Sequence, residues 1–225
     1  AQRVTDLRKV KPAAISDYVA WMGGKGKSAA TVTRALASIK SFYAFLAERG
    51  EIETNPAKGV AALKVERRFP EILTGKEVEL FLDQPQCVDA KGYRDHAMLE
   101  LLYATGIRVS ELQFITVEAA KCGEAVVRCK GKTRAVFIVR ELRQKLLRYA
   151  AEQNIQSGMI FVTRTGKPIS RTNIWREMKA LCIEADVNPQ KVFPQNLRHL
   201  FARVFYGIEK DIAKLADILG HSSIN

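Results

Sequence analysis

Two arginines and a histidine, far apart in the chain, are suited to reaction at a phosphate. Arg108 follows the glycine in ATGIRVSEL, Arg198 lies in the apolar segment NLRHLFA, and His221 follows the glycine in LGHSS. Cutting a phosphodiester without a metal requires fixed cations at the nonbridging oxygens, where negative charge grows in the transition state. Arginine suits this role because its planar guanidinium offers paired donors and stays protonated. The alternative for each arginine is an ion pair within the fold.

The same reaction requires a proton donor at the leaving 5′ oxygen and an attacking group on the opposite side of the phosphorus. The segments GEAVVRC and RAVFIV are rich in β-branched residues and flank KGKT, which predicts a β-hairpin with a basic tip.

Charge is the informative part of the composition. The 225 residues contain 36 Lys and Arg against 24 Asp and Glu, a net charge of +12, which is typical of proteins with a phosphate-rich partner. Membranes and acidic proteins are the alternative partners of a basic protein. No apolar run approaches the roughly 20 residues that span a bilayer, and AQRVTDLRKV does not resemble a signal peptide, so we expect a cytoplasmic protein.

The cysteines and histidines show no spacing typical of a zinc site, so no metal is expected. We expect reduced, mostly buried thiols, a structural His96, and a His199 that packs within the core. The cysteines are Cys87, Cys122, Cys129 and Cys182, and the histidines are His96, His199 and His221.

Helical patterns dominate the N-terminal part. A helix is predicted over residues 13–22 with Pro12 in its first turn, followed by the loop GGKGK, which contains Lys25 and Lys27. Ser28 is expected to cap a long helix that ends at Gly50. We expect its aromatic residues to serve in packing rather than base stacking, and its apolar side to contain Val32, Leu36, Ile39, Phe42, Phe45 and Leu46.

A linker is predicted over residues 67–71, between a helical domain (1–66) and a second domain (72–225) that begins with a Thr74–Glu77 capping box. The second domain is expected to be mainly helical with a small hairpin or sheet, an α+β fold. Helices are predicted over 93–106, 107–115, 141–153, 171–185, 195–207 and 208–219, and a short strand over 159–162.

The chain resembles the tyrosine recombinase, or integrase, family. RDHAMLELLYATGIRVSEL is similar to the family segment around its first arginine, NLRHLFA to its second, and LGHSS to the segment before its nucleophile; all three occur in the family order. The similarity covers nearly the whole chain and extends to Xer enzymes and to integrases of mobile elements. It implies a C-shaped, two-domain DNA clamp, formed by a core-binding domain that lacks its first helix and a catalytic domain.

The resemblance implies that Arg108 and Arg198 contact the scissile phosphate and that Glu111 orients Arg108. His221 would add a hydrogen bond or assist proton transfer. Lys130 matches the family's general acid, and Lys132 is its rival, because a one-residue shift in register exchanges the side chain that faces the site.

The sequence departs from the family pattern at two places. Gln195 stands where the family usually has a histidine; glutamine can donate a hydrogen bond but cannot act as a general base. The family's tyrosine nucleophile is expected beyond Asn225, so residues 1–225 alone are expected to bind DNA without cutting it. The tyrosines present, Tyr206 included, are expected to be core or surface residues.

The resemblance thus predicts a site-specific recombinase that forms a 3′-phosphotyrosine intermediate without metal, ATP or another cofactor. The partners implied are a duplex recombination site, three further protomers and a directionality factor. An inactive accessory DNA-binding protein of the same fold and a basic helical regulator are the alternatives. Contacts mainly to DNA phosphates are expected from Lys25, Lys27, Arg34, Lys40, Lys132 and Arg134.

Overall fold

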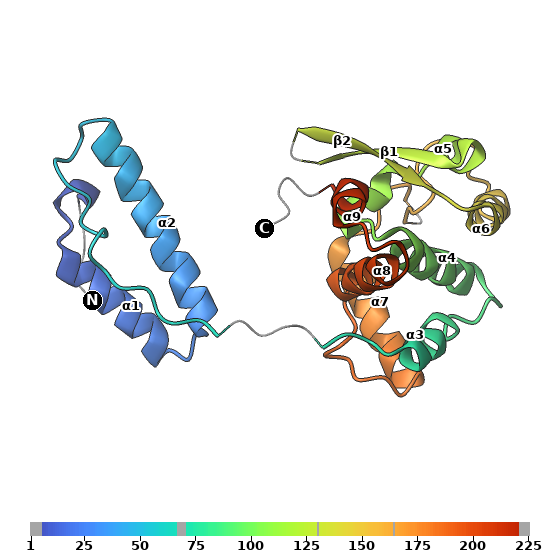
Figure 1. Ribbon diagram of the computed structural model, residues 1–225, viewed down its shortest axis with the longest axis horizontal. Coiled ribbons are helices and arrows are strands. Elements are labelled where there is room, and N and C mark those ends of the chain that lie inside the picture. Colours follow the sequence, from blue (N-terminus) through green and yellow to red (C-terminus); the bar gives the residue numbers. More distant parts are fainter. Residues whose placement is uncertain (1–5, 67–70, 130, 164, 221–225) are drawn as a thin grey trace. The chain divides into compact units, whose positions relative to one another are not determined.

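A computed structural model describes residues 6–66, 71–129, 131–163 and 165–220. The chain divides into two compact units, residues 1–69 and 70–225. The predicted linker lies, apart from Glu71, outside the described residues. The elements of both units are labelled in Figure 1.

The N-terminal unit is built on two helices that pack against each other along their length (Figure 1). Pro12 occupies the first turn of the first helix, as predicted. Ser28 caps the second helix through its hydroxyl, which accepts the backbone N–H of Thr31 at 3.3 Å, also as predicted. The elements are the 3₁₀ helix η1 (Leu7–Lys9), α1 (Pro12–Gly24) and α2 (Ala29–Glu48).

Only one stripe of α2 is buried. The core cluster of this unit contains Ile15, Leu36, Tyr43, Leu46, Ala57 and Val60. Phe42 and Phe45, which were predicted to lie on the apolar side of this helix, are 41% and 51% exposed. Phe42 lines a groove together with Trp21, whereas Phe45 carries the guanidinium of Arg49 over its ring.

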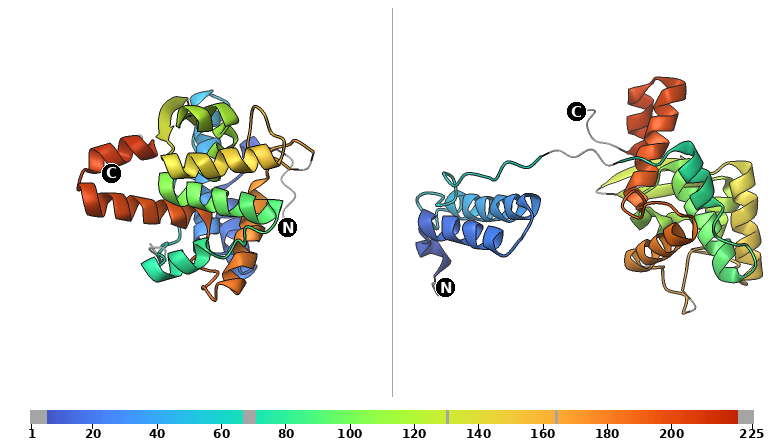
Figure 2. Two further views of the ribbon diagram at one scale, coloured as in Figure 1. Left: turned by 90° about the vertical axis from the view of Figure 1, so that its right-hand side faces the viewer. Right: turned by 90° about the horizontal axis from the view of Figure 1, so that it is seen from below.

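The C-terminal unit is mainly helical and arranged around one central helix. This helix, α4, packs against α3, α6 and α8, and Figure 2 shows α4 and α6 side by side. In chain order the elements are α3 (Gly75–Leu82), α4 (Ala90–Thr105), the 3₁₀ helix η2 (Val109–Phe114), α5 (Val117–Cys122), β1 (Glu124–Cys129), β2 (Lys132–Phe137), α6 (Arg140–Glu152), α7 (Arg171–Glu184), α8 (Pro194–Glu209) and α9 (Ile212–Leu219).

The ends of α3 and α4 follow from their capping residues. The predicted capping box is present at α3, where Thr74 and Glu77 exchange hydrogen bonds. Gly106 ends α4 in the left-handed conformation, at φ 59°. Helix α4 begins at Ala90, earlier than predicted, because the Asp89 carboxylate caps it by accepting the backbone N–H of Gly92 at 2.7 Å.

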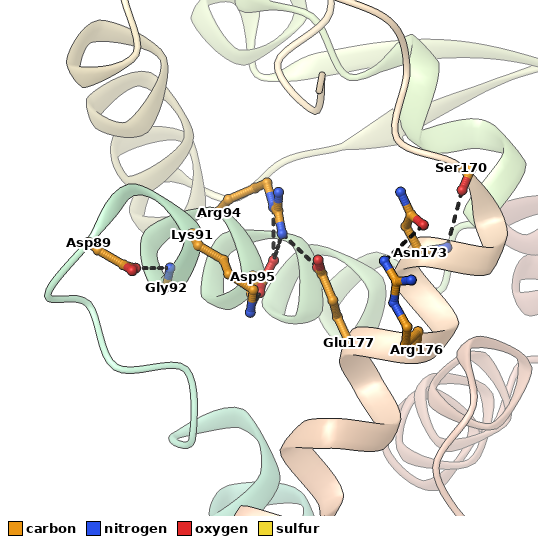
Figure 3. A network of polar contacts seen from close by, with 9 residues as sticks. All are labelled: Asp89, Lys91, Gly92, Arg94, Asp95, Ser170, Asn173, Arg176 and Glu177. Atoms are coloured by element: carbon orange, nitrogen blue, oxygen red, sulfur yellow. Dashed lines mark hydrogen bonds and ion pairs between the residues drawn. The ribbon is translucent and has the colours of Figure 1, made fainter. Parts of the chain in front are cut away.

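An ionic network centred on the buried Asp95 joins α4 to α7 (Figure 3). Arg94 donates to Asp95 Oδ1 at 2.7 Å and to Glu177 Oε2 at 2.6 Å, and Lys91 donates to Asp95 Oδ2 at 3.0 Å. The Asp95 side chain is 2% exposed. Burial, and then the adjacent Asp95 carboxylate, raise the pKa of Glu177. The network fixes α7 on the helix that leads to Arg108.

The predicted hairpin forms, with a shorter tip than the KGKT segment suggested. Strands β1 and β2 are antiparallel, and their register pairs Val127 with Arg134 and Cys129 with Lys132. Gly131, the residue immediately before β2, has a φ angle of 76°. Strand β1 packs on η2 and strand β2 on α9.

Three further predictions were wrong. The strand expected over 159–162 is replaced by isolated bridges at Met159 and Val162. His199 is exposed rather than packed in the core, because the adjacent residue on α8, Arg198, occupies the buried face. Among the described cysteines, Cys182 is buried, whereas Cys87 and Cys122 are exposed on surface segments. Burial raises the pKa of the Cys182 thiol.

Within the described ranges, no helix is both long and apolar enough to cross a membrane.

Candidate active site

Arg108 lies at the junction of α4 and η2, where the chain changes direction after Gly106. Its backbone N–H donates to Glu111 Oε2 at 2.8 Å, and its Nη1 donates to Glu111 Oε1 at 3.1 Å. The Arg108 side chain remains 32% exposed, whereas that of Glu111 is 1% exposed. The guanidinium is thus fixed from the protein side and still accessible to a ligand.

Glu111 binds a second guanidinium. Arg134 on β2 donates from Nη2 to Glu111 Oε2 at 2.7 Å, and its side chain is 12% exposed. A buried carboxylate requires such partners, because removing its charge from water is costly. One acid therefore joins the Arg108 segment to the hairpin.

Arg198 is buried on α8 and donates to two helix ends. Its Nη1 lies 2.6 Å from the carbonyl oxygen of Gly106, and its Nη2 lies 2.5 Å from that of Leu219. Gly106 ends α4 two residues before Arg108, and Leu219 is the last residue of α9. These carbonyl groups are ones that helix geometry leaves without intrahelical donors. The two contacts bring together three segments that are distant in the sequence.

Two glycines allow these segments to approach closely. A Cβ atom at Gly106 would lie 2.6 Å from Phe201 Cδ1, and one at Gly220 would lie 2.9 Å from both Cδ and Nε of Arg134. Both glycines also have positive φ angles, 59° and 65°. Larger residues at these positions would separate α8 from α4, and α9 from the hairpin.

Lys130 and His221 lie outside the described residues. The backbone of position 132 is described, and strand alternation puts positions 132, 134 and 136 on one face of the hairpin. Position 134 on that face contacts Glu111. The assignment of the general acid to Lys130 rather than Lys132 stays a prediction.

The remaining predicted residues lie at different places. Gln195 is exposed in the first turn of α8, ahead of Arg198. Lys25, Lys27 and Arg34 are exposed on the N-terminal unit, and Lys40 there is partly buried. DNA contact by these four basic residues stays a prediction, as it does for Lys132 and Arg134.

A polar cluster that fixes the start of α8 was not predicted. Asn196 is 1% exposed, and its Nδ2 donates to the carbonyl oxygens of Glu71 at 2.7 Å and Lys191 at 2.5 Å. Lys191 in turn contacts the carboxylates of Glu71 and Glu77 at 2.9 and 3.1 Å. The Thr74 backbone N–H, and then Lys191, hold the pKa of Glu77 below its ordinary value. The flanking residues in QNLRH, polar Gln195 and apolar Leu197, do not distinguish Asn196 from a surface residue, so no sequence signal pointed to this cluster.

Among the described residues, no group of three or more His, Cys, Asp or Glu side chains is placed to hold a metal ion.

Comparison with known families identifies the chain. The model of the phage integrase family matches residues 71–225, and that of the phage integrase N-terminal SAM-like domain matches residues 1–50. The chain belongs to the phage integrase family. This family model includes the α4–η2 junction, the hairpin, α8 and α9.

Curated relatives of this integrase are tyrosine recombinases. Tyrosine recombinase XerD of Halalkalibacterium halodurans is 31% identical over 231 residues, which cover 99% of this chain and 77% of the relative. Tyrosine recombinase XerC of Thermodesulfovibrio yellowstonii is 30% identical over 229 residues, which cover 96% of this chain and 76% of the relative. The integrase is therefore an Xer-like tyrosine recombinase, a class that breaks and rejoins DNA strands at specific sites.

Solved structures agree on the fold of the integrase. A post-cleavage complex of XerH recombinase with palindromic difH DNA superposes with a TM-score of 0.79 at 19% identity, covering 99% of this chain and 69% of that one. The Tn1549 transposon integrase with transposon right-end DNA gives a TM-score of 0.78 at 20% identity, covering 99% and 82%. The predicted mainly helical tyrosine recombinase fold is confirmed.

Proposed function

We propose that the chain binds a duplex DNA recombination site and that Arg108 and Arg198 contact the nonbridging oxygens of the phosphate to be cut. The observation that carries this proposal is the pair of hydrogen bonds from Arg198 to the carbonyl oxygens of Gly106 and Leu219. They join the segment that carries Arg108 to the helix end that precedes His221. The Glu111 carboxylate supports this proposal, since it accepts hydrogen bonds from both the backbone N–H and the side chain of Arg108.

The proposed reaction uses these residues together with a tyrosine nucleophile. A tyrosine supplied from outside residues 1–225 attacks the phosphorus, and the P–O5′ bond breaks as the bond to the tyrosine oxygen forms. The tyrosine proton passes to water, because the amide of Gln195 cannot act as a base. Lys130 donates a proton to the leaving 5′ oxygen, and Lys132 is the alternative donor. Gln195 and His221 donate hydrogen bonds to the phosphate.

No high-energy cofactor is needed, because the 3′-phosphotyrosine conserves the energy of the phosphodiester for rejoining. Rejoining runs through the same groups in reverse, with a 5′ hydroxyl as the nucleophile. The two arginines stabilise the growing negative charge in both directions, which is the role that a metal ion has in other nucleases.

The N-terminal unit supplies much of the binding energy in this proposal. Lys25, Lys27, Arg34 and Lys40 contact DNA phosphates, so affinity depends strongly on salt. Strand exchange requires two DNA duplexes, and four protomers on paired sites, assisted by a directionality factor, provide this. The protein acts in the cytoplasm, where the DNA is located.

Covalent trapping tests the proposal. DNA that binds residues 1–225 is selected from a random pool, and nicked duplexes of that sequence are incubated with a chain that extends beyond Asn225 and includes the nucleophile. A nick next to the cut site lets a short strand diffuse away, so the phosphotyrosine complex accumulates. We expect an SDS-resistant complex, reduced at least about 10²-fold by Arg108→Ala or Arg198→Ala. Tight, specific binding with no covalent complex would instead identify an accessory DNA-binding protein.

A further inference from the structure

We infer that Arg134 is a positioning residue for the general acid: it holds the hairpin against the Arg108 segment and against the end of α9. The inference rests on the proposed function. It replaces the DNA contact that the sequence predicted for Arg134, and it assigns a new role in the cleavage step to a residue of the hairpin strand.

The hairpin has two strands, so its position depends on contacts with the rest of the unit. Isolated two-stranded ribbons are marginally stable in water and twist readily. Here Arg134 pairs with Val127 across the ribbon and lies two residues after Lys132, the first residue of β2. A movement of the ribbon by a fraction of an ångström changes the position of any lysine at its tip relative to the phosphate. Proton transfer requires hydrogen-bond distance, so its rate depends on that position.

Glu111 couples Arg134 directly to Arg108. The same oxygen, Oε2, accepts Nη2 of Arg134 at 2.7 Å and the backbone N–H of Arg108 at 2.8 Å. Since the Glu111 side chain is 1% exposed, water cannot easily replace either donor. The hairpin and the Arg108 segment are thereby fixed to one buried atom.

Gly220 supplies the second contact. The Cδ and Nε atoms of Arg134 lie 2.9 Å from the point where a Cβ at residue 220 would lie, so the arginine side chain crosses the face of this glycine. Strand β2 packs on α9 at this place. Arg134 thus touches the end of α9, immediately before position 221, while its guanidinium binds Glu111.

Arginine is suited to this position and lysine is not. The stem of Arg134 passes Gly220 before its planar guanidinium reaches Glu111, whereas an ammonium group offers a point charge on a shorter, more flexible stem. Arg134→Lys therefore keeps the charge and loses the geometry. If Arg134 instead served only as a cation for DNA, lysine would be an adequate substitute.

The test separates loss of acid catalysis from loss of phosphate binding by changing the leaving group. In a substrate with sulfur in place of the bridging 5′ oxygen, the leaving thiolate needs no proton, so a misplaced general acid no longer matters. The trapping assay described above is run with both substrates under single-turnover conditions. The variants are Arg134→Met, Arg134→Lys, Lys130→Ala and Lys132→Ala.

We expect Arg134→Met to slow cleavage of the ordinary phosphodiester about 10²-fold or more, and Arg134→Lys to slow it less. With the sulfur-containing substrate, both variants recover to within about 10-fold of the unaltered protein, as does the variant of whichever lysine is the general acid. Arg198→Ala stays slow with both substrates, because its proposed role is at the nonbridging oxygens. Arg128→Met is the matched control: Arg128 is exposed on the hairpin, opposite Thr133, and its loss leaves both rates unchanged.

Three results would overturn the inference. Equal loss on both substrates would mean that Arg134 acts at the phosphate or through the fold as a whole. Weaker DNA binding with normal cleavage at saturation would restore the DNA-contact role. Normal cleavage of the ordinary substrate by Arg134→Met would leave no role in the acid step. If Arg134→Met fails to fold, the cleavage rates of Arg134→Lys on the ordinary and the sulfur-containing substrates provide the same test. Absence of a covalent complex with the unaltered protein on either substrate would instead refute the proposed function.

Discussion

Arg198 Nη1 donates a hydrogen bond of 2.6 Å to the carbonyl oxygen of Gly106, and this contact connects α8 with the end of α4. The second bond of the same guanidinium, to Leu219, connects α8 with the end of α9. Arg198 therefore has a structural role whether or not a phosphate is bound. Measuring both the free energy of unfolding and the cleavage rate of the same Arg198 variants separates this structural role from the proposed role at the phosphate.

Replacing Arg198 with methionine should destabilise the C-terminal unit by about 2–5 kcal/mol, because two buried carbonyl groups lose their donors. The measurement is the free energy of unfolding from urea denaturation. Arg203→Met is the matched control, since Arg203 is exposed on the same helix and its loss should cost under about 0.5 kcal/mol. Equal stability of the two variants would show that the Arg198 contacts contribute little.

Gly106→Ala should destabilise the unit by more than the cost of its backbone conformation. A positive φ costs a non-glycine residue about 1–2 kcal/mol, and the new Cβ would also lie 2.6 Å from Phe201 Cδ1. Gly166→Ala isolates the first cost, because Gly166 has φ 75° and open space around it. Truncating the ring in Gly106→Ala/Phe201→Ala should remove the clash, so the double variant should be more stable than the sum of the two single losses predicts.

Stability should fall as pH rises through the titration of Glu177. Burial and the Asp95 carboxylate raise the pKa of Glu177 in the folded protein, so the folded state binds more protons than the unfolded state in this window. The window begins near the ordinary glutamate pKa of 4.5 and ends at the raised folded value. Glu177→Gln should flatten the pH dependence of the unfolding free energy, whereas Glu152→Gln, at an exposed position, should not. If Glu177→Gln left the pH dependence of the unfolding free energy unchanged, Glu177 would not be the group responsible for it.

Asn196→Asp should cost about 2–4 kcal/mol, because it replaces the Nδ2 donor with a carboxylate oxygen beside the carbonyl groups of Glu71 and Lys191. Asn196→Ala should cost less, since it removes the donor without adding a buried charge. Thermal and urea unfolding of both variants check this order. The reverse order would mean that the amide does not serve as the donor at this place.

DNA affinity should depend on salt through the N-terminal unit. Changing Lys25, Lys27 or Arg34 to glutamine should weaken binding by similar factors on all sequences and lower the slope of log K against log salt by about 1 each. Titrations of a labelled duplex at several salt concentrations measure the slope. If a variant binds DNA more weakly but keeps the same slope, the residue that was replaced does not contact a phosphate.

Sequence patterns were most reliable where one residue determines a local structure. Ser28, the Thr74–Glu77 pair and Gly106 each set a helix end at the predicted place, because capping depends on hydrogen bonds within a few residues. The ion pair between Glu111 and Arg108 has the same local character.

Contacts between distant segments could not be read in this way. Nothing in the sequence indicates that Arg134 binds Glu111, or that Asn196 binds the backbone of Glu71, because each depends on how separate elements pack. The predicted packing of His199 within the core was wrong for the same reason, since only the folded arrangement shows that Arg198 occupies the buried face of α8.

The two carbonyl groups bound by Arg198 also limit what comparison of relatives can reveal. A descendant that no longer cut DNA would still be selected to keep this arginine, because losing it would weaken folding. Its retention therefore cannot distinguish active enzymes from inactive copies. Exposed positions such as Gln195, where a substitution has little effect on folding, are free to vary once cleavage is no longer selected, and they are the better markers of retained activity.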